Sequence, residues 1–272
     1  MQELFWENTA GQRLRALHWP SGNPKAVIAL VHGQGEHIGR YGHLAAWFNA
    51  HRVAVIGHDQ QGFGKSAGKR GHFSRYDGLL DDVGLLLERA RAAHPGLPVF
   101  LYGHSMGGQV VLNFALRRRP QIAGLVATGP WVRLAFEAPV LKVAVGRLLK
   151  KIWPALTLPT GLNADHVSRD PDVVAAYRSD PLVHDQVSAS AGIQMLLAAR
   201  WLNQFAGPAP VRTLLLHGGD DRLTSAAATR ELAARLVGDV THREWPGLFH
   251  EIHNEPEQNE VFADILAWMQ AI

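Results

Sequence analysis

The 272-residue chain contains no cysteine, no long apolar run and almost no excess of charge of one sign. The absence of cysteine excludes a disulfide framework and a metal site built on thiolates. No apolar stretch reaches the ~18 residues that a membrane-spanning helix needs, so we expect no such helix. The 27 basic and 24 acidic residues leave a net charge of +3, which argues against a nucleic-acid partner.

The N-terminus also lacks the marks of a targeting segment. Glu3 and Glu7 stand where a secretory signal peptide carries Lys or Arg, and no apolar core follows them. We therefore expect a cytoplasmic protein. With 47% hydrophobic residues, the chain can bury one sizeable core, and it is somewhat long for a bare α/β domain. One domain with an insertion is the simplest organisation.

Residues 103–107 have the sequence G-H-S-M-G, which fits the G-x-S-x-G pattern of a nucleophile elbow. The apolar run at 97–102 predicts a buried strand before it, and residues 108–118 predict a helix after it. This context matters because the serine occupies a sharp, strained turn in which larger flanking side chains would clash. Ser105 is therefore the candidate nucleophile.

A serine nucleophile needs a base, and the base needs an orienting acid. In proteins with this elbow the order along the chain is Ser, then Asp or Glu, then His. The predicted strand 211–216 is followed by two acids, Asp220 and Asp221, either of which could be the partner. The carboxyl edge of a parallel sheet, where both acids are expected, is where sites form in open α/β folds.

The base has three candidates near the C-terminus. His250 lies in a loop after a predicted strand at 240–245 and before a C-terminal helix. His242 lies inside that strand, and His253 could cap the helix, so the loop position favours His250. The expected triad is Ser105, Asp221 and His250.

The alternation of apolar runs with helical patterns predicts an α/β fold with a mostly parallel central sheet covered by helices on both faces. An N-terminal hairpin is expected within residues 3–20. Further strands are expected at 26–31, 53–56, 97–102, 122–126, 211–216 and 240–245, and helices at 41–51, 74–90, 108–118, 226–236 and 255–272.

The alternation breaks between residues 131 and 206, which contain helical patterns but no clear strand. We expect this segment to be a helical cap inserted into a core of residues 1–130 and 207–272. Residues 139–153 are amphipathic, which favours an acyl pocket or contact with a membrane or micelle, although plain packing on the core is an equal alternative. The candidate substrate-binding residues there are Val140, Leu141, Leu148, Leu149 and Trp153; a second helix at 190–205 is expected to turn Ile193, Leu196, Leu197 and Trp201 inward.

Acyl transfer also needs donors for the negative charge that develops on the carbonyl oxygen. One candidate is the backbone N–H of Met106, because it follows the nucleophile at a helix N-terminus. The other usually comes from the loop after an early strand, here residues 32–37, so the backbone N–H of Gln34 is the second candidate.

Residues 32–41, H-G-Q-G-E-H-I-G-R-Y, resemble the H-G-x-G-E-H-x-x-R-Y segment of the monoacylglycerol lipase family of α/β-hydrolases, also described as lysophospholipase-like or serine-aminopeptidase-like. Residues 103–108 match its G-H-S-M-G-G elbow, and the H-G-x-x-D spacing of its acid motif favours Asp221. Segments 249–253, 58–66 and 169–182 are also similar, so the resemblance covers almost the whole chain. Gln34 is a departure, because the family often has a small residue there.

The resemblance implies a serine hydrolase that cleaves single-chain lipid esters through an acyl-enzyme, with monoacylglycerol as the expected substrate and a mobile apolar cap. Lysophospholipase, thioesterase and broad carboxylesterase activities are alternatives, and a non-catalytic ligand-binding relative is another. No cofactor is expected. No metal is expected either, because residues 250–253, H-E-I-H, are one residue short of the H-E-x-x-H zinc motif.

Overall fold

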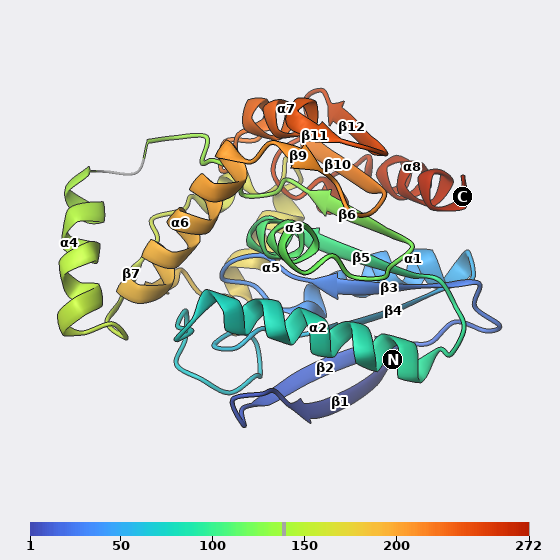
Figure 1. Cartoon of the computed structure of the whole chain (residues 1–272), viewed down its shortest axis with the longest axis horizontal. Helices are drawn as coiled ribbons and strands as arrows, with labels where there is room; N and C mark the ends of the chain where they lie inside the picture. Colours follow the sequence, from blue (N-terminus) through green and yellow to red (C-terminus); the bar gives the residue numbers. More distant parts are fainter. Residues whose placement is uncertain (138–139, 272) are drawn as a thin grey trace.

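The computed structural model describes residues 1–137 and 140–271, without the side chains of residues 140–142. Within these residues one sheet of eight strands has the order β1-β2-β4-β3-β5-β6-β10-β12 (Figure 1). The pairs β1–β2 and β2–β4 are antiparallel, and the remaining pairs are parallel. The strands are β1 (Gln2–Glu7), β2 (Arg13–Trp19), β3 (Ala26–Val31), β4 (Val53–His58), β5 (Val99–His104), β6 (Gly124–Thr128), β10 (Thr213–Gly218) and β12 (Val240–Trp245).

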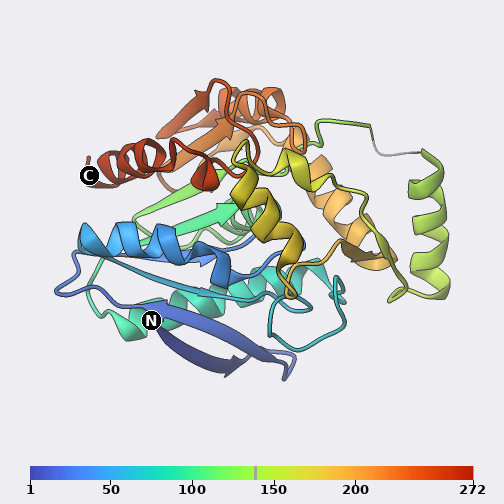
Figure 2. The same ribbon diagram turned by 180° about the vertical axis from the view of Figure 1, so that it is seen from behind.

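The central strands are buried on both faces, and their side chains alternate between two cores. In β3, Val27 and Ala29 belong to one buried cluster, while Ile28 and Leu30 belong to the other. Helices α2 (Tyr76–Ala93), α3 (Met106–Arg118) and α7 (Ala226–Arg235) cover the first face. Helices α1 (Gly42–Ala50) and α8 (Gln258–Gln270) cover the second, which faces the viewer in Figure 2. The predicted α/β-hydrolase architecture is confirmed.

Between β6 and β10 the chain leaves the sheet and crosses the end where the parallel strands finish. This segment contains α4 (Val140–Ile152), β7 (Thr157–Pro159), the 3-10 helix η2 (Ala164–His166), α5 (Pro171–Ser179), β8 (Gln186–Ser188) and α6 (Ala189–Gln204). The expectation of no strand there is wrong in one detail, because β7 and β8 pair as a short antiparallel hairpin.

Helix α6 joins the segment to the core through Ala191, Met195, Ala198 and Leu202, which are buried. Leu197 is exposed, contrary to expectation, because these small and apolar residues form the face that packs. Helix α4 stands outside α6 at the edge of the molecule (Figure 1). That residues 131–206 form a separate lid stays a prediction.

Candidate active site

Ser105 occupies the turn between β5 and α3, with φ 55° and ψ −116°. A positive φ is unusual for a residue with a side chain and marks a strained turn. The strain is held by close packing on both sides. A Cβ on Gly103 would lie 2.5 Å from the carbonyl oxygen of Gly107, and a Cβ on Gly107 would lie 2.2 Å from that of Val31. Only glycine fits at these two positions.

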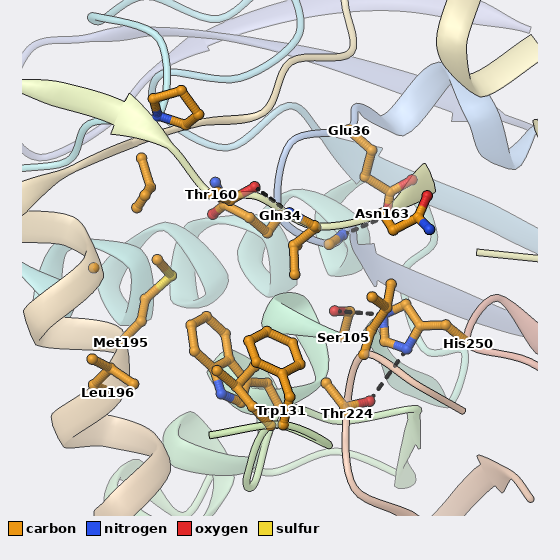
Figure 3. A pocket seen from close by; sticks show the side chains of 18 of the residues that line it. Gln34, Glu36, Ser105, Trp131, Thr160, Asn163, Met195, Leu196, Thr224 and His250 are labelled. Carbon is orange, nitrogen blue, oxygen red and sulfur yellow. Dashed lines mark hydrogen bonds between the residues drawn. The ribbon is translucent and has the colours of Figure 1, made fainter. Parts of the chain in front are cut away.

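The structure brings the three residues of the expected triad into one hydrogen-bonded chain. His250 Nε2 lies 2.9 Å from Ser105 Oγ (Figure 3), and His250 Nδ1 lies 2.7 Å from Asp221 Oδ2. Asp221 has a fully buried side chain. Its carboxylate also accepts hydrogen bonds from the hydroxyl of Thr224 and from the backbone N–H of Leu223. These donors fix the carboxylate so that one oxygen faces the imidazole.

The other candidates for the acid and the base lie away from this hydrogen-bonded chain. Asp220 is exposed to solvent, and His242 lies within β12. His253 is fully buried in the 3-10 helix η3 (Ile252–Asn254), stacked on the ring of Tyr41. None of these three side chains hydrogen-bonds to Ser105 or Asp221 in the described part of the chain.

The pKa values of the acid and the base are shifted in opposite directions. Burial would raise the pKa of Asp221, but the neighbouring His250 and His217 outweigh it and hold that pKa well below its ordinary range. Burial would lower the pKa of His250, but the charge and hydrogen bond of Asp221 raise it above its ordinary value of 6.5. The pair therefore favours an ionised carboxylate beside an imidazole that accepts a proton readily.

The two candidate oxyanion donors lie on either side of the serine. Met106 is the first residue of α3, where backbone N–H groups and the helix dipole favour negative charge. The loop of Gly33 and Gln34 packs against the elbow so closely that a Cβ on Gly33 would lie 3.2 Å from Ser105 Cβ. The Gln34 side chain donates to the backbone oxygen of Gln186 in the cap segment, at 3.1 Å.

Glu36 and Arg40 form a buried ion pair. Their side chains are 3% and 10% exposed, and Arg40 also forms a two-point ion pair with Glu251, which is 4% exposed. Glu36 accepts a hydrogen bond from the backbone N–H of Gly33 at 2.6 Å and another from the hydroxyl of Tyr41. Burial opposes ionisation, but Arg40 lowers the pKa of Glu36 to about 2. The cluster therefore ties the oxyanion loop to the loop that carries His250.

A cavity of about 560 Å³ opens above Ser105 and His250, between the sheet and the cap segment (Figure 3). Its walls are of two kinds. The polar lining includes Gln34, Glu36, Thr160, Asn163, Tyr177 and Glu251; the apolar lining includes Trp131, Leu134, Phe136, Val143, Ile193, Met195 and Leu196.

Three of the expected cap residues are not part of this lining. Leu148, Leu149 and Trp153 lie outside it, and the side chains of Val140 and Leu141 lie outside the described part of the chain. Helix α4 instead turns Val143, Val145 and Gly146 toward the cavity. The physical reason is that α4 packs this face against α6, where a Cβ on Gly146 would make an ordinary van der Waals contact with Ile193 at 3.5 Å.

Sequence reasoning missed Trp131 and Met195, which line the cavity. A signal existed for Trp131, because it follows β6 at the carboxyl edge of the sheet, where sites form. Among residues 1–137 and 140–271, no group of His, Asp and Glu side chains is arranged to hold a metal ion. In the same residues no helix has the length and apolar character needed to cross a bilayer.

A serine at a strand–helix elbow, hydrogen-bonded through histidine to a buried aspartate at the same sheet edge, defines a serine hydrolase of the α/β-hydrolase class. More narrowly, the chain belongs to the Hydrolase_4 family, described as "Serine aminopeptidase, S33", which it matches over residues 22–257. It is 37% identical over 252 residues to a monoacylglycerol lipase of Mycolicibacterium smegmatis, covering 92% of this chain and 90% of that one.

Two further relatives carry the same kind of name. Human monoglyceride lipase is 36% identical over 268 residues, which cover 96% of this chain and 88% of that one. The crystal structure of Paleococcus ferrophilus monoacylglycerol lipase superposes with a TM-score of 0.86 at 34% identity, covering 94% of this chain and 98% of that one. The expectation of a serine ester hydrolase from this family is thus confirmed.

Proposed function

We propose that the protein hydrolyses monoacylglycerols to a fatty acid and glycerol. The observation that carries this proposal is the Ser105–His250–Asp221 chain beneath a cavity whose lining includes both apolar and polar side chains. An acyl chain fits against the apolar side chains of α6 and α4, and a glycerol group has hydrogen-bond partners on the polar wall. The names of the relatives support the same substrate.

In the proposed reaction, His250 Nε2 removes the proton of Ser105 as Oγ bonds to the ester carbonyl carbon. The backbone N–H groups of Gln34 and Met106 stabilise the negative carbonyl oxygen. The bond to the glycerol oxygen then breaks, and His250 returns the proton to that oxygen. Water, deprotonated by His250, attacks the acyl-enzyme. The bond to Ser105 Oγ then breaks, His250 returns the proton to Oγ, and the fatty acid is released. Asp221 holds the imidazole tautomer and stabilises its cationic form in both halves.

The test is a series of initial rates on 1-monoacylglycerols of graded chain length, with lysophosphatidylcholine and acyl-coenzyme A of matched chains. We expect monoacylglycerol to give the highest kcat/KM, with an optimum at one chain length. Ser105→Ala should lower the rate by about 10³-fold or more. A preference for the thioester or the lysophospholipid would reject the substrate assignment while leaving the nucleophile in place.

We also propose that α4 rests on a lipid surface. Leu148 and Ile152 lie one turn apart on one face of this helix and are exposed, and the exposed Trp153 directly follows the helix. Lys150 and Lys151 flank it, as in helices that lie in a membrane interface.

Co-sedimentation with vesicles of phosphatidylcholine and phosphatidylglycerol tests this contact. Replacing Leu148 and Ile152 with Ser should weaken vesicle binding about tenfold or more, because two apolar side chains no longer leave water. Val237→Ser is the matched control, since Val237 is also exposed but lies in β11 (Leu236–Val237), away from α4. Equal binding by the double variant and the control would contradict the proposal.

A further inference from the structure

The imidazole of His217 hydrogen-bonds to the same oxygen of Asp221 that holds His250. His217 lies in β10 with a fully buried side chain, and its Nε2 lies 3.0 Å from Asp221 Oδ2. His250 Nδ1 lies 2.7 Å from that oxygen. His217 is not part of the cavity lining above Ser105. The carboxylate therefore lies between two imidazole rings, and His250 carries the link to the nucleophile.

The partners of His217 fix which of its two ring nitrogens carries a hydrogen. Its Nε2 also lies 3.2 Å from the backbone oxygen of Thr224, and this oxygen and the ionised carboxylate of Asp221 can only accept. Nε2 must therefore be an N–H donor. Nδ1 lies 2.9 Å from the hydroxyl of Thr229 in α7, which can donate to it. The ring is thus held with its Nε2–H directed at Asp221.

The hydroxyl of Thr224 cannot replace this donor. Its oxygen lies 2.7 Å from Asp221 Oδ2 and 3.0 Å from the backbone oxygen of Gly129, and both of these atoms only accept. One hydroxyl hydrogen serves one of them at a time. Among the residues that the structure describes, His217 and His250 are thus the donors that Oδ2 keeps, while backbone N–H groups hold the other oxygen, Oδ1.

We propose that His217 is a positioning residue for the hydrolytic reaction, which keeps Asp221 Oδ2 directed at His250 and keeps the carboxylate ionised. It acts through Asp221 and not on the substrate. This inference depends on the proposed ester hydrolysis and adds to it the group that controls the acid of the triad. Without the Nε2–H of His217, the buried carboxylate would lose a charge-assisted hydrogen bond.

The loss of that hydrogen bond has a definite sign in the pH dependence of the reaction. When the Asp221–His250 pair binds a proton, its charge changes from negative to neutral. The N–H of His217 stabilises the negative state, so removing it raises the pKa at which the pair takes up the proton. The other titratable groups that face His250 stay unchanged in the variants below: Glu36, Glu251, His104 and His253.

The experiment measures the pH dependence of kcat/KM, and kcat and KM at the high-pH plateau, on a p-nitrophenyl ester and the matching 1-monoacylglycerol. His217→Leu removes the donor, so the inflection should move to higher pH. Its plateau kcat should fall about tenfold, the effect of one hydrogen bond to a charged group, with KM unchanged. His217→Gln can place an amide N–H near the position of Nε2, so it should keep the wild-type inflection and recover most of the kcat.

A second variant and a matched control complete the set. Thr229→Val keeps the shape of the side chain but removes the hydroxyl that polarises His217, so the inflection should move in the same direction as in His217→Leu. This variant carries the test if His217→Leu does not fold. The control is His242→Leu in β12, because His242 is half-buried and its Nε2 has no hydrogen-bond partner in the described part of the chain. It should keep the wild-type inflection.

An unmoved inflection in folded His217→Leu, or an equal shift in His217→Gln, would overturn the inference, because His217 would then only fill space in the core. A raised KM at the wild-type kcat would also overturn it. Failure of the proposed function gives a different result. The p-nitrophenyl ester would be cleaved and the monoacylglycerol would not, and the inflection on the p-nitrophenyl ester would still report the role of His217.

Discussion

At the scale of single residues, the orientation of His250 depends on Asp221, whose Oδ2 lies 2.7 Å from His250 Nδ1. In Asp221→Asn an amide N–H₂ can face the imidazole and stabilise the wrong tautomer, in which Nε2 carries the proton and cannot accept one. We expect kcat to fall by about 10³–10⁴-fold, the loss that this change causes in other serine hydrolases. Initial rates on a soluble ester measure it.

The matched control for that variant is Asp220→Asn. Its side chain is exposed beside the same strand, so its rate should stay at the wild-type value. Circular dichroism should show both variants folded, because the asparagine that replaces Asp221 still offers one oxygen to the N–H of Leu223. A loss of activity in Asp220→Asn as large as in Asp221→Asn would contradict the assignment of the acid.

The pH dependence of the rate follows from the same pair. The base must be neutral to act, and the pKa of His250 is raised above 6.5 because Asp221 outweighs the opposing effect of burial. In the wild type, kcat/KM should therefore rise with pH through an inflection above 6.5. In Asp221→Asn the carboxylate charge is gone and burial remains, so the inflection of the residual activity should move to lower pH. An inflection at the same pH in both proteins would argue against this coupling.

At the scale of the elements, glycines at two helical positions have opposite roles. In α3, a Cβ on Gly107 would lie 2.2 Å from the oxygen of Val31 and 2.5 Å from that of His32, both backbone atoms. Gly107→Ala should lower the free energy of unfolding by about 1–3 kcal/mol or more and reduce activity, since the oxyanion loop must move. In α2, Gly78 has nothing within 4 Å of a built Cβ.

Gly78→Ala should therefore raise the free energy of unfolding by about 0.5–1 kcal/mol. Urea unfolding at neutral pH measures both glycine variants against the wild type. If Gly107→Ala were as stable as Gly78→Ala, the packing at the elbow would be looser than the distances indicate.

The elements also show where sequence reasoning succeeds. The apolar run 26–31 predicted β3 to the residue, because a strand buried on both faces needs apolar side chains throughout. The sequence predicted a helix from residue 74, but α2 begins at Tyr76, whose N–H donates to Gln194 Oε1. That partner comes from α6, 118 residues away, so no local pattern could reveal it.

The residues of the candidate site also fall into those that the sequence could predict and those that it could not. Ser105, Asp221 and His250 were predictable because motifs and strand ends mark them in the chain. The cavity wall was not, because the face of α4 that lines it is set by packing against Ile193 of α6, which lies in a different part of the chain. An amphipathic pattern gives the apolar face of a helix but not which neighbour it contacts.

At the scale of the whole molecule, Arg40 joins parts of the chain that are 211 residues apart. Its guanidinium donates to Glu36 on the oxyanion loop at 2.8 Å and to both oxygens of Glu251, next to His250, at 2.7 Å. Removing this positive charge leaves the two buried carboxylates without their positively charged partner. Arg40→Met should therefore lower the free energy of unfolding by about 3–5 kcal/mol at pH 7. Arg118→Met is the matched control: the Arg118–Asp81 pair is more exposed, and a change within about 0.5 kcal/mol is expected.

The pH dependence of the stability loss in Arg40→Met distinguishes the effect of the missing charge from the effect of the missing side-chain packing. In the wild type the pKa of Glu36 is lowered to about 2, so its contribution to stability is complete above its unfolded value of 4.5 and disappears as the pH falls toward 2. Without Arg40, burial raises the pKa of Glu36, and protonation relieves the variant as the pH falls from 7 to 5. Urea unfolding should show a smaller difference between variant and wild type at pH 5 than at pH 7. An equal difference at both values would mean that Arg40 contributes through the packing of its carbon chain, and the electrostatic link between the two loops would be rejected.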